Sequence, residues 1–300
     1  MQLASRDRLL DLSSPVVMGI INVTPDSFSD GGRFLQPEDA VAEALNMIEA
    51  GAAIIDIGAE STRPGAVPVP ADTQLRRLLP VLEAVRPRCD AFLSVDTGDA
   101  RVISTVIEAG ADMINDVYAL RQPGALAAAA AGGAAVCLMH MLGTPATMQE
   151  QPQYESFPDD ILDFLGHRAA EARAAGIAAD RIVLDPGFGF GKSDRHNLAL
   201  LQELDRVCQL GYPVLAGLSR KRTLGQVTGR APADRKAAGL AVAVLAAERG
   251  VSIIRTHDVP ETVDALRIVD ACRRAGDEAR RDTTGEGTTG SGMHDRRADE

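Results

Sequence analysis

Short, almost wholly apolar segments recur along the chain, and alanine-rich stretches with a helical period lie between them. Apolar runs of this length are typical of parallel strands that are buried on both faces. We expect strands at residues 16–22, 53–58, 91–96, 113–117, 135–140, 182–186, 213–219 and 252–257. The pattern therefore predicts an α/β fold in which strands and helices alternate.

The stretches between these segments carry the usual signals of helix starts and stops. Val41, Leu45 and Ile48 follow one another at helical spacing, and Gly51 stands where such a helix would stop. We expect helices at residues 37–50, 99–109 and 159–175.

Eight strand–helix units in 300 residues favour a closed (β/α)8 TIM barrel, a fold that commonly uses about 250 residues as one domain. An open doubly wound sheet is the alternative. Its dinucleotide-binding version needs a Gly-x-Gly-x-x-Gly segment after the first strand, and the sequence has none there.

A repeated segment supports the barrel. In each copy a helix stops at a glycine, a strand follows, and a polar residue comes seven positions after a glutamate. The copies are residues 49–56, 108–115 and 248–255. Because equal spacing gives equal depth, Asp56, Asn115 and Arg255 are predicted to lie near the C-terminal rim of the barrel, where TIM barrels hold their active sites.

Polar residues also end the other predicted strands. They are Asn22, Asp96, His140, Asp185, Ser219 with Lys221, and Arg255 with His257. A single aspartate at a strand end is most often a helix cap or a turn residue. Caps do not explain a polar residue at the same end of every strand, and we therefore predict a site at this rim.

The rim residues predict two kinds of ligand contact. Asp96, Asn115 and Asp185 offer hydrogen bonds suited to a flat heterocycle with several donors and acceptors. Arg255 and His257 lie two positions apart on the last strand, so their side chains share a face. An arginine fork suits phosphate oxygens, and this pair is therefore predicted to hold an anion.

Two connections at the rim, residues 22–36 and 59–71, exceed the usual length of about two to six residues. Both mix Gly or Pro with Ser, Thr, Asp and Arg, a composition suited to closing over an anionic substrate. The chain has only three lysines, so we expect Lys221 to contact the ligand. Lys192 ends a glycine-rich run, 187–192, that resembles a phosphate loop but lacks its spacing.

Composition narrows the classes of protein further. A net charge of -11 without a basic stripe argues against nucleic acid as a partner. No apolar run approaches the roughly 20 residues that span a bilayer, and the first residues lack a signal-peptide layout. We expect a cytoplasmic protein without a membrane partner. The four cysteines are scattered, which favours core residues over a zinc site or a disulfide framework.

Eight segments, one for each strand end and in the same order, resemble the dihydropteroate synthase family. They are residues 19–32, 56–65, 94–97, 114–117, 139–140, 185–192, 219–221 and 254–258. The resemblance covers roughly residues 15–275. We assign residues 1–275 to a pterin-binding barrel. Residues 276–300 are rich in charge, Gly and Thr, and we expect a disordered tail without a catalytic role.

The resemblance implies a transferase that joins a pterin diphosphate to 4-aminobenzoate in folate biosynthesis. It implies that the pterin is held by Asp96, Asn115, Asp185 and Lys221, with Met139 and Phe190 lining its pocket. It implies that the diphosphate is bound by Asn22, Arg255 and His257, with Asn22 also holding Mg2+. The implied 4-aminobenzoate residues are Phe28, Thr62, Arg63, Pro64 and Ser219. The catalytic residues would be Lys221, Arg255 and His257.

The resemblance also implies the order of the reaction, a homodimer and sensitivity to sulfonamides. Diphosphate would leave first, stabilised by the cationic residues, and the neutral arylamine would attack last. Two alternatives stay open. A pterin-dependent methyltransferase needs neither the loop of Thr62, Arg63 and Pro64 nor the pair of Arg255 and His257. A non-catalytic pterin-binding paralogue would be expected to lose Lys221 or a loop motif.

Overall fold

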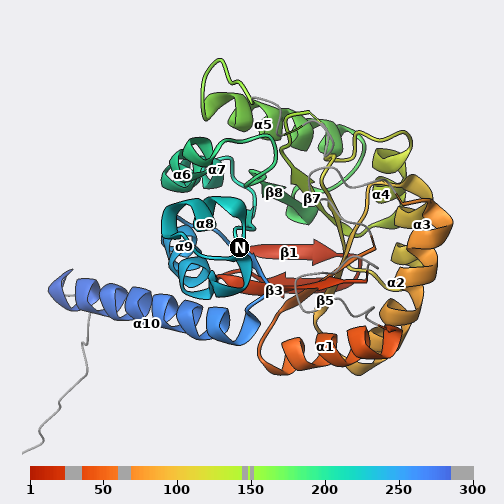
Figure 1. Cartoon of the computed structure of the whole chain (residues 1–300), viewed down its shortest axis with the longest axis horizontal. Helices are drawn as coiled ribbons and strands as arrows, with labels where there is room; N and C mark the ends of the chain where they lie inside the picture. The colour runs from red at the N-terminus through yellow and green to blue at the C-terminus, as the bar shows by residue number, and fades with distance from the viewer. Residues whose placement is uncertain (24–35, 60–68, 144–147, 149–151, 285–300) are drawn as a thin grey trace, which may run out of the picture.

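The computed structural model describes residues 1–23, 36–59, 69–143, 148 and 152–284. A parallel sheet of eight strands lies at the centre, in the order β8-β7-β6-β5-β4-β3-β10-β9, and helices surround it (Figure 1). The strands are β3 (Val16–Asn22), β4 (Ile54–Gly58), β5 (Phe92–Asp96), β6 (Met113–Asp116), β7 (Ala135–Met139), β8 (Ile182–Asp185), β9 (Leu215–Ala216) and β10 (Ile253–Thr256). The predicted (β/α)8 TIM barrel is confirmed.

The barrel closes between β8 and β9 by a bridge rather than by a ladder. Among the described residues, Leu184 and Val214 form one isolated parallel bridge there. The backbone N–H of Leu184 donates to the carbonyl of Pro213 at 2.9 Å. Of the predicted segment 213–219, only Leu215–Ala216 has strand geometry.

The helices follow the strands in the predicted alternation. They are α1 (Pro37–Glu49), α2 (Ala71–Val85), α3 (Ala100–Glu108), α4 (Ala125–Gly132), α5 (Asp159–Ala174), α6 (Asp194–Gln202), α7 (Leu204–Cys208), α8 (Arg222–Thr228), α9 (Lys236–Glu248) and α10 (Val259–Thr284), with short 3-10 turns at Arg86–Arg88, Ala179–Arg181 and Pro232–Asp234. Among the described residues, no helix is both long and apolar enough to cross a bilayer.

Two layers of core explain why the strands are apolar almost throughout. Side chains on one face of the strands, such as Ile55 and Leu93, pack under the helices. Their neighbours on the opposite face fill the lower half of the barrel: Met18, Ile54, Phe92, Met113, Ala135, Cys137, Val183, Leu215 and Ile253. Because alternate residues share a face, the next inward positions, among them Asp56 and Asn115, form a polar layer directly above this core.

A hairpin that the apolar pattern did not predict closes the N-terminal end of the barrel. It consists of β1 (Gln2–Ser5) and β2 (Arg8–Asp11), and Leu3 packs into the inner core. The buried carboxylate of Asp112, just before β6, lies 3.3 Å from Arg8 and 2.6 Å from Arg86. The pair with Arg8 of β2 fastens the hairpin to the barrel, and the pair with Arg86 ties the end of α2 to the same carboxylate.

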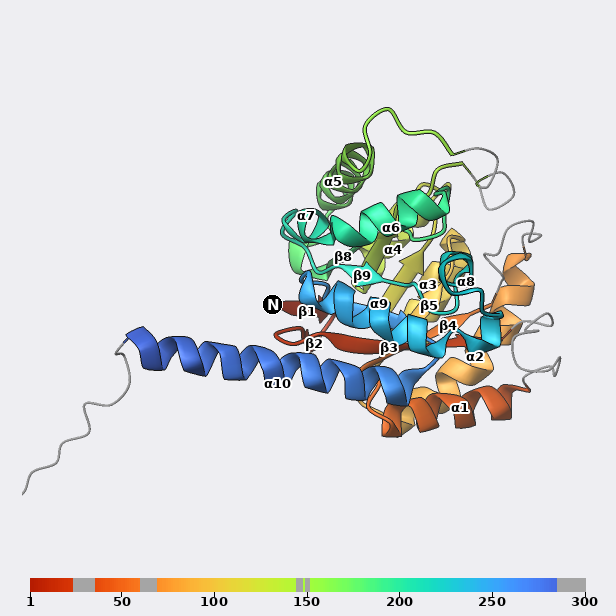
Figure 2. The ribbon, with the colours of Figure 1, turned by 60° about the vertical axis from the view of Figure 1, so that its left-hand side comes forward.

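The last helix, α10, extends past residue 276, where the tail was expected to start. α10 continues to Thr284, so residues 276–284 are helical rather than disordered. Arg280 pairs with Asp277 one turn away at 3.2 Å, a spacing that supports a solvent-exposed helix. Figure 2 shows this part of α10 projecting past the barrel. Residues 285–300 lie outside the described residues.

Candidate active site

Asp56 organises the polar layer at the C-terminal rim. Its buried carboxylate accepts hydrogen bonds from the Ser94 hydroxyl at 2.6 Å, the Asn115 amide at 3.1 Å and Nε of Arg255 at 2.7 Å. The Arg255 guanidinium also lies 3.7 Å from Asp96. Burial lowers the pKa of Arg255, but these carboxylates more than offset it, and the pKa rises. The guanidinium is thus held as a fixed cation.

These contacts also fix which way the Asn115 side chain points. A carboxylate only accepts hydrogen bonds, so the Asn115 amide nitrogen must face Asp56. Its carbonyl oxygen is then left to accept from a ligand. The predicted set of site residues did not include Asp56, although the repeated segment had placed it at this depth.

Asp185 and Lys221 form the opposite side of the polar layer. Burial lowers the pKa of Lys221 to about 8, although Asp185 acts in the other direction. Burial also raises the pKa of Asp185, with Lys221 opposing. Nζ of Lys221 donates to the Phe188 carbonyl and lies 4.8 Å from the centre of the Phe190 ring. Asp185 accepts from the backbone N–H of Gly187 at 2.7 Å.

An apolar wall adjoins this pair of charges. Met139 is buried in a small cluster with Val117, Met141 and Met148, and the Phe190 ring packs against it. Met139 and Phe190 therefore share one apolar cluster, and their role in lining a ligand pocket stays a prediction. The structure turns the next residue, His140, away from the rim. Its ring contacts Phe164 of α5 edge-on, with the ring centres 5.0 Å apart.

Ser219 and His257 are in direct contact. The Ser219 hydroxyl oxygen accepts from the backbone N–H of His257 at 3.2 Å and lies 3.0 Å from its Nδ1. If the hydroxyl donates its proton to Nδ1, the ring carries its own proton on Nε2. The adjacent Arg220 has a positive φ of 57° and pairs with Asp258 at 2.8 Å. The Ser219–Lys221 turn is therefore tied to the end of β10.

Asn22 ends β3 and is partly buried. Among the described residues there is no group of three or more His, Cys, Asp or Glu side chains that could hold a metal ion. Mg2+ prefers oxygen ligands and often completes its shell with water and substrate phosphates. A single carboxamide oxygen from Asn22 fits that kind of site. Four predicted residues of the second subsite, Phe28, Thr62, Arg63 and Pro64, lie outside the described residues.

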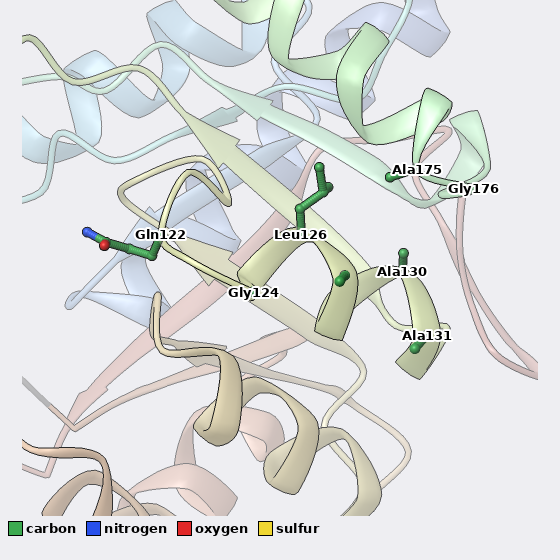
Figure 3. Close-up of a pocket in the computed structure, with 8 residues that line it drawn as sticks. Gln122, Gly124, Leu126, Ala130, Ala131, Ala175 and Gly176 are labelled. Atoms are coloured by element: carbon green, nitrogen blue, oxygen red, sulfur yellow. The ribbon is translucent and has the colours of Figure 1, made fainter.

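One hollow among the described residues has a lining that includes none of these rim residues. It has a volume of about 660 Å3 and lies on the outer wall, where α4 faces the end of α5 (Figure 3). Its lining residues are Gln122, Gly124, Leu126, Ala127, Ala130, Ala131, Ala175 and Gly176. None of them is ionisable, and the reactive groups lie instead at the rim.

The chain is similar to known proteins over most of its length. The model of a family described as pterin binding enzyme matches residues 18–257. The dihydropteroate synthase of Escherichia coli (strain K12) is 48% identical over 280 residues, which are 93% of this chain and 99% of that protein. The Yersinia pestis dihydropteroate synthase, solved in a sulfonamide drug complex, has 50% identity and a TM-score of 0.89, with coverage of 91% and 100%. The Xanthomonas albilineans dihydropteroate synthase with 4-aminobenzoic acid has 50% identity and a TM-score of 0.85, with coverage of 91% and 98%.

Proposed function

The chain belongs to the dihydropteroate synthase family, a family of pterin-binding transferases in folate biosynthesis, and from this premise we propose how its rim carries out the reaction. The substrates are 6-hydroxymethyl-7,8-dihydropterin diphosphate and 4-aminobenzoate, and the products are 7,8-dihydropteroate and diphosphate. The observation that carries the proposal is the position of Arg255. Asp56 accepts hydrogen bonds from both Arg255 and Asn115. The Arg255 cation therefore lies between the proposed heterocycle pocket and the proposed anion site.

The pterin binds in the polar layer above the inner core. Asp96, Asn115 and Asp185 are each nine-tenths buried or more and offer acceptors to the ring N–H groups. Lys221 donates to a ring acceptor. Met139 and Phe190 pack against the ring. Leaving these buried polar groups unpaired would cost about 1–3 kcal/mol each, so they select a ligand that satisfies them.

The diphosphate leaves against the cationic side of the rim. The bond between the pterin methylene carbon and the diphosphate oxygen breaks, and the electron pair stays with the diphosphate. Arg255, His257 and Lys221 stabilise the charge that develops there. Asn22 would hold Mg2+, which supplies further positive charge to the phosphate oxygens when bound.

4-Aminobenzoate then attacks the methylene carbon through its neutral amino nitrogen, and the proton that this nitrogen loses as the carbon–nitrogen bond forms passes to water. Ser219, beside His257, would line this subsite together with Phe28, Thr62, Arg63 and Pro64. A solved relative contains 4-aminobenzoic acid, and another contains a sulfonamide drug complex. We expect sulfonamides to compete with 4-aminobenzoate in this chain as well.

A two-substrate assay tests the proposal. Diphosphate release should require both the pterin diphosphate and 4-aminobenzoate, and dihydropteroate should form in equal amount. Pterin binding without turnover would indicate the non-catalytic paralogue. Binding of a methylated pterin with methyl transfer to a corrinoid protein would indicate the methyltransferase.

We further propose a cytoplasmic homodimer. Three neighbouring helices, α6, α8 and α9, carry the exposed apolar side chains of Leu198, Val227 and Leu245. Their burial against a second copy would remove apolar surface from water. All four cysteines are free thiols, as is usual in a reducing compartment. Light scattering tests the dimer, and a monomeric mass would exclude it.

A further inference from the structure

Lys192 is a buried lysine that the proposed reaction does not use. It is 1% exposed and follows the glycine-rich run that carries Phe190. Its Nζ donates to the carbonyl of Gly187 at 2.8 Å and to that of Phe190 at 3.1 Å. The third partner is Nδ1 of His140 at 2.9 Å. The amine of Lys192 therefore makes its hydrogen bonds to groups of the protein and has none left for a ligand, which argues against a phosphate-binding role.

The glycines explain how backbone carbonyls come to face this lysine. Gly187, Gly189 and Gly191 have φ values of 69°, 82° and 64°, which side-chain-bearing residues rarely adopt. A Cβ at Gly187 would lie 1.9 Å from the carbonyl oxygen of His140, and one at Gly191 would lie 2.6 Å from that of Leu142. The run thus lies directly on the chain that leaves β7, at a distance only glycine permits.

Two lysines hold this run from different points. Lys192 binds the carbonyls of Gly187 and Phe190, whereas Lys221 binds the carbonyl of Phe188 between them. Lys221 also lies over the Phe190 ring. The position of that ring therefore depends on both amines, although only Lys221 lies at the rim.

His140 extends the contact to the second wall of the pocket. It directly follows Met139, whose side chain belongs to the cluster against which Phe190 packs. Burial, with Lys192 adding to it, lowers the pKa of His140 to about 2. Its ring is therefore neutral and can offer Nδ1 as an acceptor. Lys192 thus links the backbone beside Met139 to the backbone beside Phe190.

We propose that Lys192 is a positioning residue of the pterin pocket, which holds the Phe190 loop against the end of β7 through His140 and two backbone carbonyls. The inference rests on the proposed function, because it assumes that the pterin packs against Phe190 and Met139. Loss of the amine would let the loop rise from β7 and would widen the pocket on its apolar side. The 4-aminobenzoate subsite would be affected less.

The test compares Lys192→Met with Lys236→Met, a surface lysine paired with Glu261. Lys192→Met should raise the pterin diphosphate KM roughly 10- to 100-fold, because small misplacements of a binding group cost about this much. Its KM for 4-aminobenzoate and the values for Lys236→Met should stay within about twofold of wild type, as for most surface changes. A folded Lys192→Met with an unchanged pterin KM, or with both KM values raised equally, would overturn the proposal.

A second pair of variants carries the test if Lys192→Met does not fold. His140→Gln keeps an acceptor for the amine and should retain the pterin KM, whereas His140→Leu should raise it. Hydrogen exchange should speed up at residues 186–191 in His140→Leu and stay unchanged in the hairpin of residues 2–11. Equal behaviour of the two His140 variants would contradict the proposal.

Calorimetry separates this inference from the proposed function. A pterin lacking the diphosphate, titrated without 4-aminobenzoate, reports the pocket alone. If the wild type binds the pterin but shows no two-substrate turnover, the proposed function fails, while the difference between Lys192→Met and wild type still decides the role of the lysine.

Discussion

Both ends of the barrel hold a buried aspartate that gathers arginine, yet the two ends serve different purposes. At the N-terminal end, Asp112 is surrounded by Arg6, Arg8 and Arg86, and the hairpin covers it. At the C-terminal end, Asp56 binds Arg255, and no strand covers this end among the described residues. The same kind of ion pair therefore holds the fold closed at the N-terminal end, through Asp112, and positions the Arg255 cation for a ligand at the C-terminal end, through Asp56.

Removing the arginine at the open end should have the largest effect on activity. Arg255→Ala is expected to lower kcat/KM about a thousandfold, the scale for losing a group that stabilises transition-state charge. Steady-state kinetics with both substrates measures it. Arg86→Ala at the closed end is the matched control and should leave kcat/KM of the folded enzyme within about twofold. An equal loss of kcat/KM in Arg255→Ala and Arg86→Ala would contradict the assignment of catalysis to one end and of stability to the other.

Neutralising the aspartate at the open end should weaken two sites together. Asp56→Asn removes the charge that fixes Arg255 and leaves one acceptor oxygen where Ser94, Asn115 and Arg255 now share two. We expect the affinities for pterin and for diphosphate each to fall at least about tenfold, as for a buried charge pair that loses one partner. Calorimetry with each ligand alone measures the two effects. A change in only one of them would mean that Asp56 does not join the two subsites.

Removing the aspartate at the closed end should act on stability instead. Asp112 also accepts the backbone N–H of Leu93 at 2.8 Å. Asp112→Ala is expected to lower the free energy of unfolding by about 2–3 kcal/mol, below the range for a wholly buried pair because its arginines still reach water. Urea unfolding measures it. A normal midpoint would show that the hairpin does not need this carboxylate.

The pH dependence of activity should also arise from a residue at the open end, Lys221. Lys221 has a pKa lowered to about 8 by burial, so it loses its proton as the pH rises through that value. The value of kcat/KM for the pterin diphosphate should then fall above pH 8. Lys221→Arg, whose guanidinium stays charged, should abolish this fall, as a pH profile would reveal.

The same shift has the opposite sign for stability. Between pH 8 and the ordinary lysine value of 10.5, the unfolded chain binds more protons at Lys221 than the folded chain does. The contribution of this residue to the free energy of unfolding therefore rises with pH in that window. Wild type should therefore gain stability relative to Lys221→Met as the pH rises through this window. A constant difference would contradict a lowered pKa.

The smallest effect is expected from the C-terminal segment, which belongs to neither end of the barrel. Truncation before Gly276 removes helical turns held mainly by exposed pairs such as Arg280 with Asp277. Such pairs contribute less than about 1 kcal/mol each. Activity and the unfolding midpoint should stay near those of the full chain. A large loss of activity would assign the segment a role at the rim.

The strands were predictable because burial on both faces leaves a continuous apolar signal. The hairpin was not, since it is short and exposes Leu9 while burying Leu3. The end of the barrel helix was also misjudged, because charged residues at helical spacing support α10 beyond its last core contacts. The local hydrophobic pattern predicts an element of this kind only when one of its faces is consistently buried.

The rim residues were predictable in position but not in their partners. Asp56 and Arg255 are separated by 199 residues in sequence, and the pairing of both β4 and β10 with β3 brings them together. Likewise the rarity of lysine marked Lys192, but not the carbonyls that it binds. Contacts across strands depend on the register of the whole sheet, which no local segment contains.

The single bridge between β8 and β9 has a thermodynamic consequence. Asp185 ends β8, and Lys221 follows β9, so a pterin bound by both would span the weakest join of the sheet. The bound ligand would then link β8 to β9 where the two strands share little backbone hydrogen bonding. By mass action, binding to the closed barrel alone raises its melting temperature with ligand concentration, and local opening should be suppressed first along this join.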